Sequence, residues 1–241
     1  MKVFIAYACA TVMLLLAGTA SATNNNTCTQ KRALKFFSQD TAGVLWQSGR
    51  HDSPRDPNGT RLMVHVLHQD NVFPYDYAGA FGECTGIIGR TLGQVRNLSF
   101  EFMNTSRPVS HPVHVTGGSP RYSIDLDTDG DGLYNTSAFL AGAHCEEVMA
   151  EDPAWSRADF TGRVTAGCSI FADVQYTSDG VKSAWKLFAE AHPTWKVLDA
   201  YLVVDEDGTT FVDRLAFHNR MFQSSGSGSA AVKACGSEAA C

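Results

Sequence analysis

Short segments in which apolar residues occupy every second position fill the middle of this chain, and they restrict its fold more than any other feature. In 98–102 the apolar residues are Leu98, Phe100 and Phe102, and 122–126 repeats the pattern. A period of two is that of a β-strand with one buried face. Strands are predicted at 61–67, 98–102, 122–126, 137–143, 164–176, 197–205 and 210–218.

One helix is predicted between these strands. Val181 and Trp185 begin a helical spacing that continues to Ala189 and stops before Pro193. Because long helices do not alternate with the strands, a doubly wound sheet is not the favoured fold. We expect a mainly β protein: an antiparallel β-sandwich, jelly-roll-like, with one crossing helix.

The first 22 residues have the pattern of a cleavable signal peptide. Lys2 precedes an apolar run at 12–17, and Ala-Ser-Ala at 20–22 is the small-x-small pattern cut by signal peptidase. A membrane anchor would need about 20 apolar residues, and this run is shorter. The mature protein is therefore expected to be secreted, with no membrane anchor. The predicted parts are a signal peptide at 1–22, a β-sandwich domain at 23–222, and a Ser/Gly-rich linker with a cysteine-containing tail at 223–241.

Cysteine usage agrees with export. Six cysteines follow the signal, an even number that suits disulfides in an oxidising compartment. The sequence allows several connectivities, but Cys145 and Cys168 each lie beside a predicted strand, and the last two cysteines are isolated together in the tail. A zinc site is the alternative, although no CxxC pair occurs. The expected disulfides are Cys28–Cys84, Cys145–Cys168 and Cys235–Cys241.

Asn-x-Ser/Thr sequons are frequent for a chain of this length. In a eukaryotic or viral exported protein they would carry glycans at the surface, whereas chance occurrence is the alternative. The sequons begin at Asn25, Asn58, Asn97, Asn104 and Asn135.

The formal net charge is -6, without a basic patch. An acidic surface repels phosphate groups, which argues against nucleic acid or an anionic membrane as the main partner. Carbohydrate or an extracellular protein is the expected partner instead.

An acidic loop at 125–132 is the sharpest local motif. Its carboxylates at alternate positions, with glycines at the turns, can converge on one calcium ion, which takes about six to eight oxygen ligands. The loop departs from an EF-hand, because Ala138 stands where the final glutamate is expected. Other oxygens, for example from the 205–207 turn or Asp213, must complete the site, or calcium binding stays weak. A solvated acidic turn without calcium is the alternative. The predicted calcium ligands are Asp125, Asp127, Asp129, Asp131 and Asp213.

The segment 201–217 joins an apolar strand, an acidic turn and a closing strand of the form aromatic–apolar–Asp. Its Asp207-Gly208 pair favours a tight turn, so a hairpin is predicted from 197 to 218. This ending resembles that of carbohydrate-binding jelly-roll modules of secreted proteins, and the acidic loop adds to the likeness. The resemblance implies a β-sandwich, a structural calcium ion and sugar binding through exposed aromatic rings.

Aromatic rings can form such a platform, because their flat apolar faces pack against the C–H groups of pyranose rings. The densest aromatic stretch is 73–82. Core packing is the alternative use of any one ring. The candidate ligand-binding residues are Tyr75, Tyr77, Tyr134 and Trp155.

Catalytic motifs are missing from the sequence. The pairs His65/His68 and His111/His114 have a spacing that sends two side chains to opposite faces of a strand, so they are poor chelates. No Gly-x-Ser-x-Gly elbow, His-Glu-x-x-His pair or Gly-rich phosphate loop occurs. Carboxylates on predicted strands that could face a cleft are Glu101, Asp125 and Asp173. No catalytic residue is assigned, and binding is favoured over catalysis.

Three functions remain as hypotheses. The first is a secreted, calcium-stabilised β-sandwich that binds carbohydrate or another extracellular ligand. The second is a structural or interaction glycoprotein of a wall, matrix or virus particle. The third is a secreted polysaccharide hydrolase or lyase.

Overall fold

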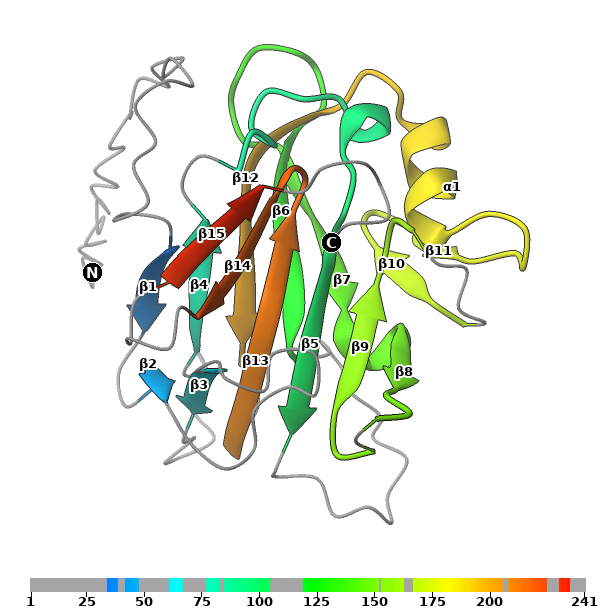
Figure 1. Cartoon of the computed structure of the whole chain (residues 1–241). Coiled ribbons are helices and arrows are strands. Elements are labelled where there is room, and N and C mark those ends of the chain that lie inside the picture. The colour runs from blue at the N-terminus through cyan, green and yellow to red at the C-terminus, as the bar shows by residue number, and fades with distance from the viewer. Residues whose placement is uncertain are drawn as a thin grey trace, which may run out of the picture.

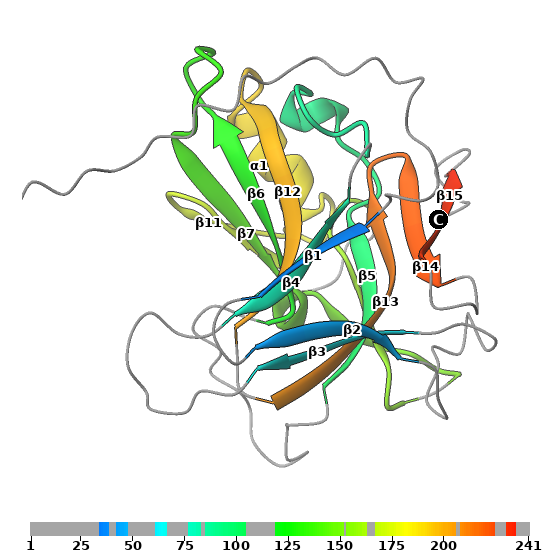
Figure 2. The same cartoon turned by 90° about the vertical axis from the view of Figure 1, so that its left-hand side faces the viewer.

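The computed structural model of the chain forms two antiparallel β-sheets that face each other, with one α-helix among the described residues (Figure 1). Turned by 90°, the sheets separate into two layers, with β6, β7 and β12 in one and β5, β13 and β14 in the other (Figure 2). This is the predicted β-sandwich, while the jelly-roll connectivity stays a prediction. The structure describes residues 34–38, 42–47, 61–66, 77–82, 85–104, 119–151, 153–162, 167–205, 208–224 and 230–234.

The first sheet has seven strands, in the order β1-β4-β12-β6-β7-β10-β11. Its strands are β1 (Leu34–Ser38), β4 (Ala78–Gly82), β12 (Lys196–Val204), β6 (Arg121–Asp127), β7 (Thr136–Ala141), β10 (Ser169–Phe171) and β11 (Gln175–Thr177).

The second sheet is organised around β13, which pairs with β5 along one edge and with β3 and β14 along the other. β9 and β8 continue the sheet beyond β5, β15 extends it beyond β14, and β2 pairs with β3. The strands are β2 (Gly43–Gln47), β3 (Arg61–Val66), β5 (Ser99–Asn104), β8 (Glu146–Val148), β9 (Ser156–Asp159), β13 (Gly208–Phe217), β14 (Arg220–Ser224) and β15 (Ala230–Ala234).

The hydrophobic core lies between the sheets, and Tyr122 joins them through it. Its ring is fully buried against Phe100 and Phe217, at centroid distances of 5.0 and 4.6 Å. Its hydroxyl donates a hydrogen bond to the Ser99 carbonyl at 2.8 Å, which satisfies the polar tip of the ring. Burial raises the pKa of this hydroxyl well above its ordinary value.

The predicted helix is confirmed as α1 (Ala184–Ala191), whose buried residues include Trp185 and Phe188. Ser183 caps it by accepting a hydrogen bond from the Lys186 backbone N–H. Val181 does not belong to the buried face and is 83% exposed. The reason is a turn before the helix, in which the Asp179 carboxylate accepts the Val181 and Lys182 N–H groups.

The hairpin predicted from 197 to 218 is wrong, because β12 and β13 lie in opposite sheets. β12 already pairs on both edges, with β4 and with β6, so neither edge is left for β13. The chain instead crosses from one layer to the other, and Leu202 and Val212 line the same core from opposite sides. Alternation shows which face of a strand is buried but does not identify its pairing partner.

Two other boundaries differ from the expectation. The strand predicted at 164–176 is two short strands, β10 and β11, which pair with each other. The sheet also continues past residue 222, because β14 runs to Ser224 and β15 pairs with it. Backbone hydrogen bonds build this edge, so its short Ala-rich strand needs no apolar alternation. In the described part, no helix combines the length and apolar character that a bilayer crossing requires.

Candidate functional site

The outward side of the seven-stranded sheet carries the most complete candidate site. Side chains alternate along each strand, so Asp199, Tyr201 and Val203 of β12 point away from the core that Ala200 and Leu202 fill. We call this side, over β1, β4, β12, β6, β7 and β10, the open face.

A row of facing residues crosses the open face from strand to strand. Phe81 of β4 lies opposite Tyr201 of β12, which lies opposite Ser123 of β6. Ser123 in turn lies opposite Phe139 of β7, and Phe139 opposite Phe171 of β10. Cross-strand partners project from the same side of a sheet. The row therefore runs perpendicular to the strands, with aromatic rings on both sides of a central serine.

At the β1 end, the rings form a cluster around Phe37. Its centroid lies 6.1 Å from that of Tyr77, 6.4 Å from Phe81 and 5.8 Å from Tyr201. The ring rests on Gly79, where an added Cβ would lie 2.5 Å from the Phe37 ring and closer still to the Leu202 carbonyl. Only glycine allows this approach, and the cluster is held against the sheet as a result.

One long side of the row is acidic. Asp199 of β12 lies opposite Asp125 of β6. Asp125 Oδ1 accepts hydrogen bonds from the Ser137 hydroxyl at 2.7 Å and the Tyr201 hydroxyl at 3.4 Å. Ser137 Oγ also lies 3.3 Å from the Tyr134 hydroxyl. Aromatic and acidic groups are thus connected in one network.

This network changes the proton affinity of its members. Desolvation raises the pKa of Asp199, the hydrogen bond from the Ala200 N–H lowers it, and the Asp125 carboxylate raises it again. Desolvation, followed by the charge of Asp125, raises the pKa of Tyr201 to about 12. Tyr201 therefore keeps its proton at neutral pH and acts as a hydrogen-bond donor.

An ion pair between Arg121 and Asp205 lies along the opposite long side of the row. Arg121 Nη1 lies 2.6 Å from Asp205 Oδ1, and the Ser119 hydroxyl donates to the same carboxylate. The Arg121 guanidinium carbon lies 5.4 Å from the centroid of the Phe139 ring, a cation–π arrangement. Asp205 thus balances the charge of Arg121 while the arginine supports the ring.

Together these side chains form a groove of about 680 Å³. Its lining combines aromatic rings with hydroxyls and carboxylates, the composition of a site for an amphipathic small molecule. Part of the aromatic surface is free, because Tyr77 is 38% exposed and Phe139 40%. The lining residues are Phe37, Tyr77, Phe81, Arg121, Ser123, Ser137, Phe139, Asp199, Tyr201, Val203 and Asp205.

The acidic loop between β6 and β7 lies at one end of the open face. Carboxylate oxygens of Asp127, Asp129 and Asp131 lie within 4.8 Å of one another, close enough to share one cation. The structure does not bring the other two predicted ligands into this group. Asp125 is turned toward Ser137 and Tyr201, and Asp213 belongs to β13 in the opposite sheet.

Asp127 shapes this loop. Its oxygens accept the Gly130 N–H at 2.6 Å and the Gly132 N–H at 3.0 Å. Both glycines have positive φ, 88° and 83°, which a residue with a Cβ rarely adopts. Desolvation alone would raise the pKa of Asp127, but these two hydrogen bonds, Asp129 and Lys196 outweigh it and lower the pKa. The carboxylate is therefore ionised at neutral pH, as a calcium ligand must be.

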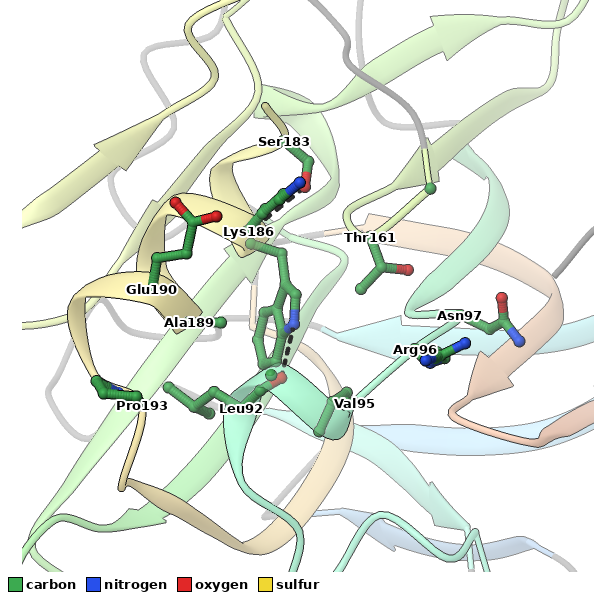
Figure 3. A pocket seen from close by; sticks show the side chains of 13 residues that line it. Leu92, Val95, Arg96, Asn97, Thr161, Ser183, Lys186, Ala189, Glu190 and Pro193 are labelled. Atoms are coloured by element: carbon green, nitrogen blue, oxygen red, sulfur yellow. Dashed lines mark hydrogen bonds between the residues drawn. The ribbon is translucent and has the colours of Figure 1, made fainter. Parts of the chain in front are cut away.

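A second groove, of about 720 Å³, lies beside α1. Ser183, Lys186 and Glu190 border it from the helix, and Arg96, Asn97 and Thr161 lie across from them (Figure 3). Its aromatic residue is not available for stacking, because Trp185 is 4% exposed and its Nε1 donates to the Leu92 carbonyl at 3.2 Å. This groove offers charged and hydroxyl groups without an accessible ring.

The four predicted ligand-binding aromatics have different locations. Tyr77 lines the groove of the open face, and Tyr134, 61% exposed, reaches the network through Ser137. Trp155 is fully buried in a small cluster with Met149 and Phe211, so no ligand can reach its ring. Tyr75 lies outside the described residues.

Sequence reasoning missed Phe37, Phe139 and Tyr201. Phe139 and Tyr201 alternate with buried residues on their strands, as Phe139 does between Ala138 and Leu140, whereas both neighbours of Phe37 on β1 are exposed. An aromatic residue in the outward position of a one-sided strand was the signal that could have identified Phe139 and Tyr201, and Phe37 carries no such local signal.

Among the predicted disulfides, Cys145–Cys168 is confirmed, and both cysteines are fully buried. Of the sequon asparagines, Asn97 donates its amide to the His218 carbonyl at 3.0 Å, and Asn135 accepts the Thr128 N–H at 2.6 Å. Asn104 ends β5, and the use of any sequon stays a prediction. The positions outside the described residues are Cys28, Cys84, Cys235, Cys241, Asn25 and Asn58.

The carboxylates considered for catalysis do not meet in one cleft. Glu101 is 2% exposed and lies 3.4 Å from Arg214 Nε in the other sheet. Asp173 lies between β10 and β11, 3.5 Å from the Thr136 hydroxyl. Asp125 alone belongs to the open face.

No family model, curated protein or solved structure matches the chain, so the function has to be inferred from its own geometry.

Proposed function

We propose that this chain is a secreted β-sandwich that binds carbohydrate in the groove of its open face. One observation carries the proposal: exposed aromatic rings and hydrogen-bonding groups share a single groove on a rigid sheet. A sugar ring needs this combination, because it presents apolar C–H faces and a rim of hydroxyls. The disulfide, formed where thiols oxidise, supports an extracellular location.

In this proposal, the aromatic rings of the groove contact the apolar faces of the sugar, and the polar groups bind its hydroxyls. Phe139 and Tyr77 supply flat apolar surface for the faces of sugar rings. Asp199 and Ser137 border the same space and can exchange hydrogen bonds with hydroxyls. Because the groups project from paired strands, little conformational entropy is lost when the ligand binds.

Calcium bound by Asp127, Asp129 and Asp131 would stiffen the β6–β7 connection in this proposal. Both strands contribute to the groove, through Ser123 and Phe139. The three carboxylates lie close together, and without a cation they repel each other. A divalent cation removes that repulsion and adds ligand bonds.

Glycan-array binding with calcium present, followed by calorimetry on the best ligand, tests the proposal. Phe139→Ala should weaken binding about tenfold, equivalent to about 1.4 kcal/mol. Phe36→Ala is the matched control, because Phe36 is 38% exposed on β1 but has the opposite orientation to Phe37. Absence of binding to every glycan, by a protein that is folded, would contradict the proposal.

An extracellular protein is the second candidate partner. Leu133 is 65% exposed and Val174 57%, and both belong to the seven-stranded layer or its loops. Such apolar side chains could be covered in a wall, matrix or virus particle. Sedimentation with an insoluble extracellular fraction, unaffected by added sugars, would favour this structural role over sugar binding.

A further inference from the structure

Resting on the proposed function, we infer that the ligand of the open face is a linear, uncharged glycan chain that lies across the strands. Direction, length and charge of the groove each contribute to this inference.

The direction follows from strand register. Phe81, Tyr201, Ser123, Phe139 and Phe171 succeed one another on neighbouring strands. Neighbouring strands lie about 4.8 Å apart, so the row from β4 to β10 extends over about 19 Å. Phe171 continues it past the groove and is 52% exposed. An extended ligand gains contact along this row, whereas one lying along a strand would leave most rings uncovered.

We infer the minimum length of the ligand from the gap at Ser123 in the row of aromatic rings. Tyr201 and Phe139 are separated by the β6 strand, a spacing of about 10 Å. One sugar ring cannot pack on both. Ser123, 2% exposed, lies at the floor of the groove, and its side chain is shorter than the rings on either side, so a middle sugar can lie between these rings. At least three consecutive sugar units are needed to contact Tyr201, the space over Ser123, and Phe139.

We infer that the ligand is uncharged from the charged side chains on the two sides of the row. Asp199 lies on one side of the groove, opposite Asp125 of the neighbouring strand. Arg121 is the one cationic side chain among the described residues that line the groove, and Asp205 balances its charge on the other side. Lys35 lies over the Phe81 ring at the far β1 end, 5.6 Å from its centroid. The centre of the groove is therefore negative and repels carboxylate or sulfate groups on a glycan.

Calorimetry with a chain-length series provides the test. Neutral oligosaccharides from disaccharide to hexasaccharide, in the gluco, xylo and manno series, are compared with polygalacturonate, alginate and heparin. The affinity for the neutral series should rise about tenfold or more from disaccharide to hexasaccharide, a gain of about 1.4 kcal/mol. The anionic polymers should bind at least tenfold more weakly at low ionic strength, and Asp199→Asn should narrow this difference.

Phe171→Ala identifies the far end of the row. It should weaken hexasaccharide binding about fivefold and leave disaccharide binding unchanged, while Phe36→Ala should change neither. Because Phe171 is largely exposed, the variant is expected to fold, and circular dichroism verifies this.

The outcomes separate the two proposals. Equal affinity for disaccharide and hexasaccharide, tighter binding of an anionic polymer, or an unchanged hexasaccharide affinity in Phe171→Ala would overturn the linear, uncharged chain while sugar binding stands. Absence of binding to every glycan tested overturns the proposed function itself, and with it the inference.

Discussion

The two sheets of the sandwich have outward sides of opposite character. On the seven-stranded sheet, Phe139 and Phe171 are 40% and 52% exposed, and the carboxylates border a groove. On the other sheet, the outward residues Glu101 and Asp213 are 2% and 1% exposed. We call this second side the closed face. Both faces come from strands with the same alternating pattern, so the pattern does not distinguish a solvated side from a covered one.

The closed face is covered in part by the connection between β8 and β9. Met149 and Trp155 from this connection pack against Phe211 and Met103. On the same face, Arg214 Nε lies 3.4 Å from Glu101 Oε1. A cation at this distance offsets part of the cost of burying the carboxylate. The closed face therefore contributes to stability, whereas the open face is available for a ligand.

The largest expected effect tests this division through stability. Trp155→Ala on the closed face should lower the free energy of unfolding by about 3–5 kcal/mol, because it leaves a cavity at a fully buried site. Phe171→Ala on the open face should lower it by about 0.5 kcal/mol. Urea denaturation measures both. Similar losses in the two variants would show that the open face is covered as well.

The next effect concerns calcium, whose predicted site borders the open face only. At a calcium concentration about 100 times the dissociation constant, the free energy of unfolding should rise by about 2.7 kcal/mol. Asp129→Ala should remove this increment, since it takes one carboxylate ligand from the cluster. Asp213→Asn should leave it intact, whatever its effect on basal stability. Thermal unfolding in calcium and in chelator gives the increment for each protein.

The smallest expected effect is a dependence of the free energy of unfolding on pH, which arises from Asp199. Its pKa is raised on folding, so its contribution to stability is present below the ordinary value of 3.8 and is lost as pH rises through the folded pKa. Asp199→Asn should therefore gain stability relative to the natural protein as the pH increases from about 3.5 to 6. Urea denaturation in chelator across this range measures the difference.

Asp179 provides a control of opposite sign. Hydrogen bonds from the Lys182 and Val181 N–H groups lower the pKa of Asp179, so its contribution is present above 3.8 and lost as pH falls. Asp179→Asn should lose stability relative to the natural protein as pH rises toward about 4.5, and the difference should then stay level up to about pH 6. If both variants follow the same trend, the network around Asp199 does not raise its pKa.

Individual residues show how far sequence reasoning reached. The helix around Trp185 and the Cys145–Cys168 disulfide were predictable, because periodicity and position beside strands are local signals. Tyr77 was identified and lies at the groove, but Trp155 was assigned to a ligand and is buried. Exposure of a ring depends on what packs over it, and its own segment does not contain that information.

The sequence by itself determined the one-sided strands at 98–102 and 122–126, where α1 lies, and that Asp127, Asp129 and Asp131 belong to one loop. These features depend on neighbours along the chain. Tertiary structure alone decided that β12 and β13 lie in opposite sheets and that Tyr201, Ser123 and Phe139 meet in one row. It also decided which outward face is open. Strand pairing, and the covering of a sheet face by another segment, both bring together segments that are distant in sequence. The energies of these contacts are therefore not specified by any local pattern.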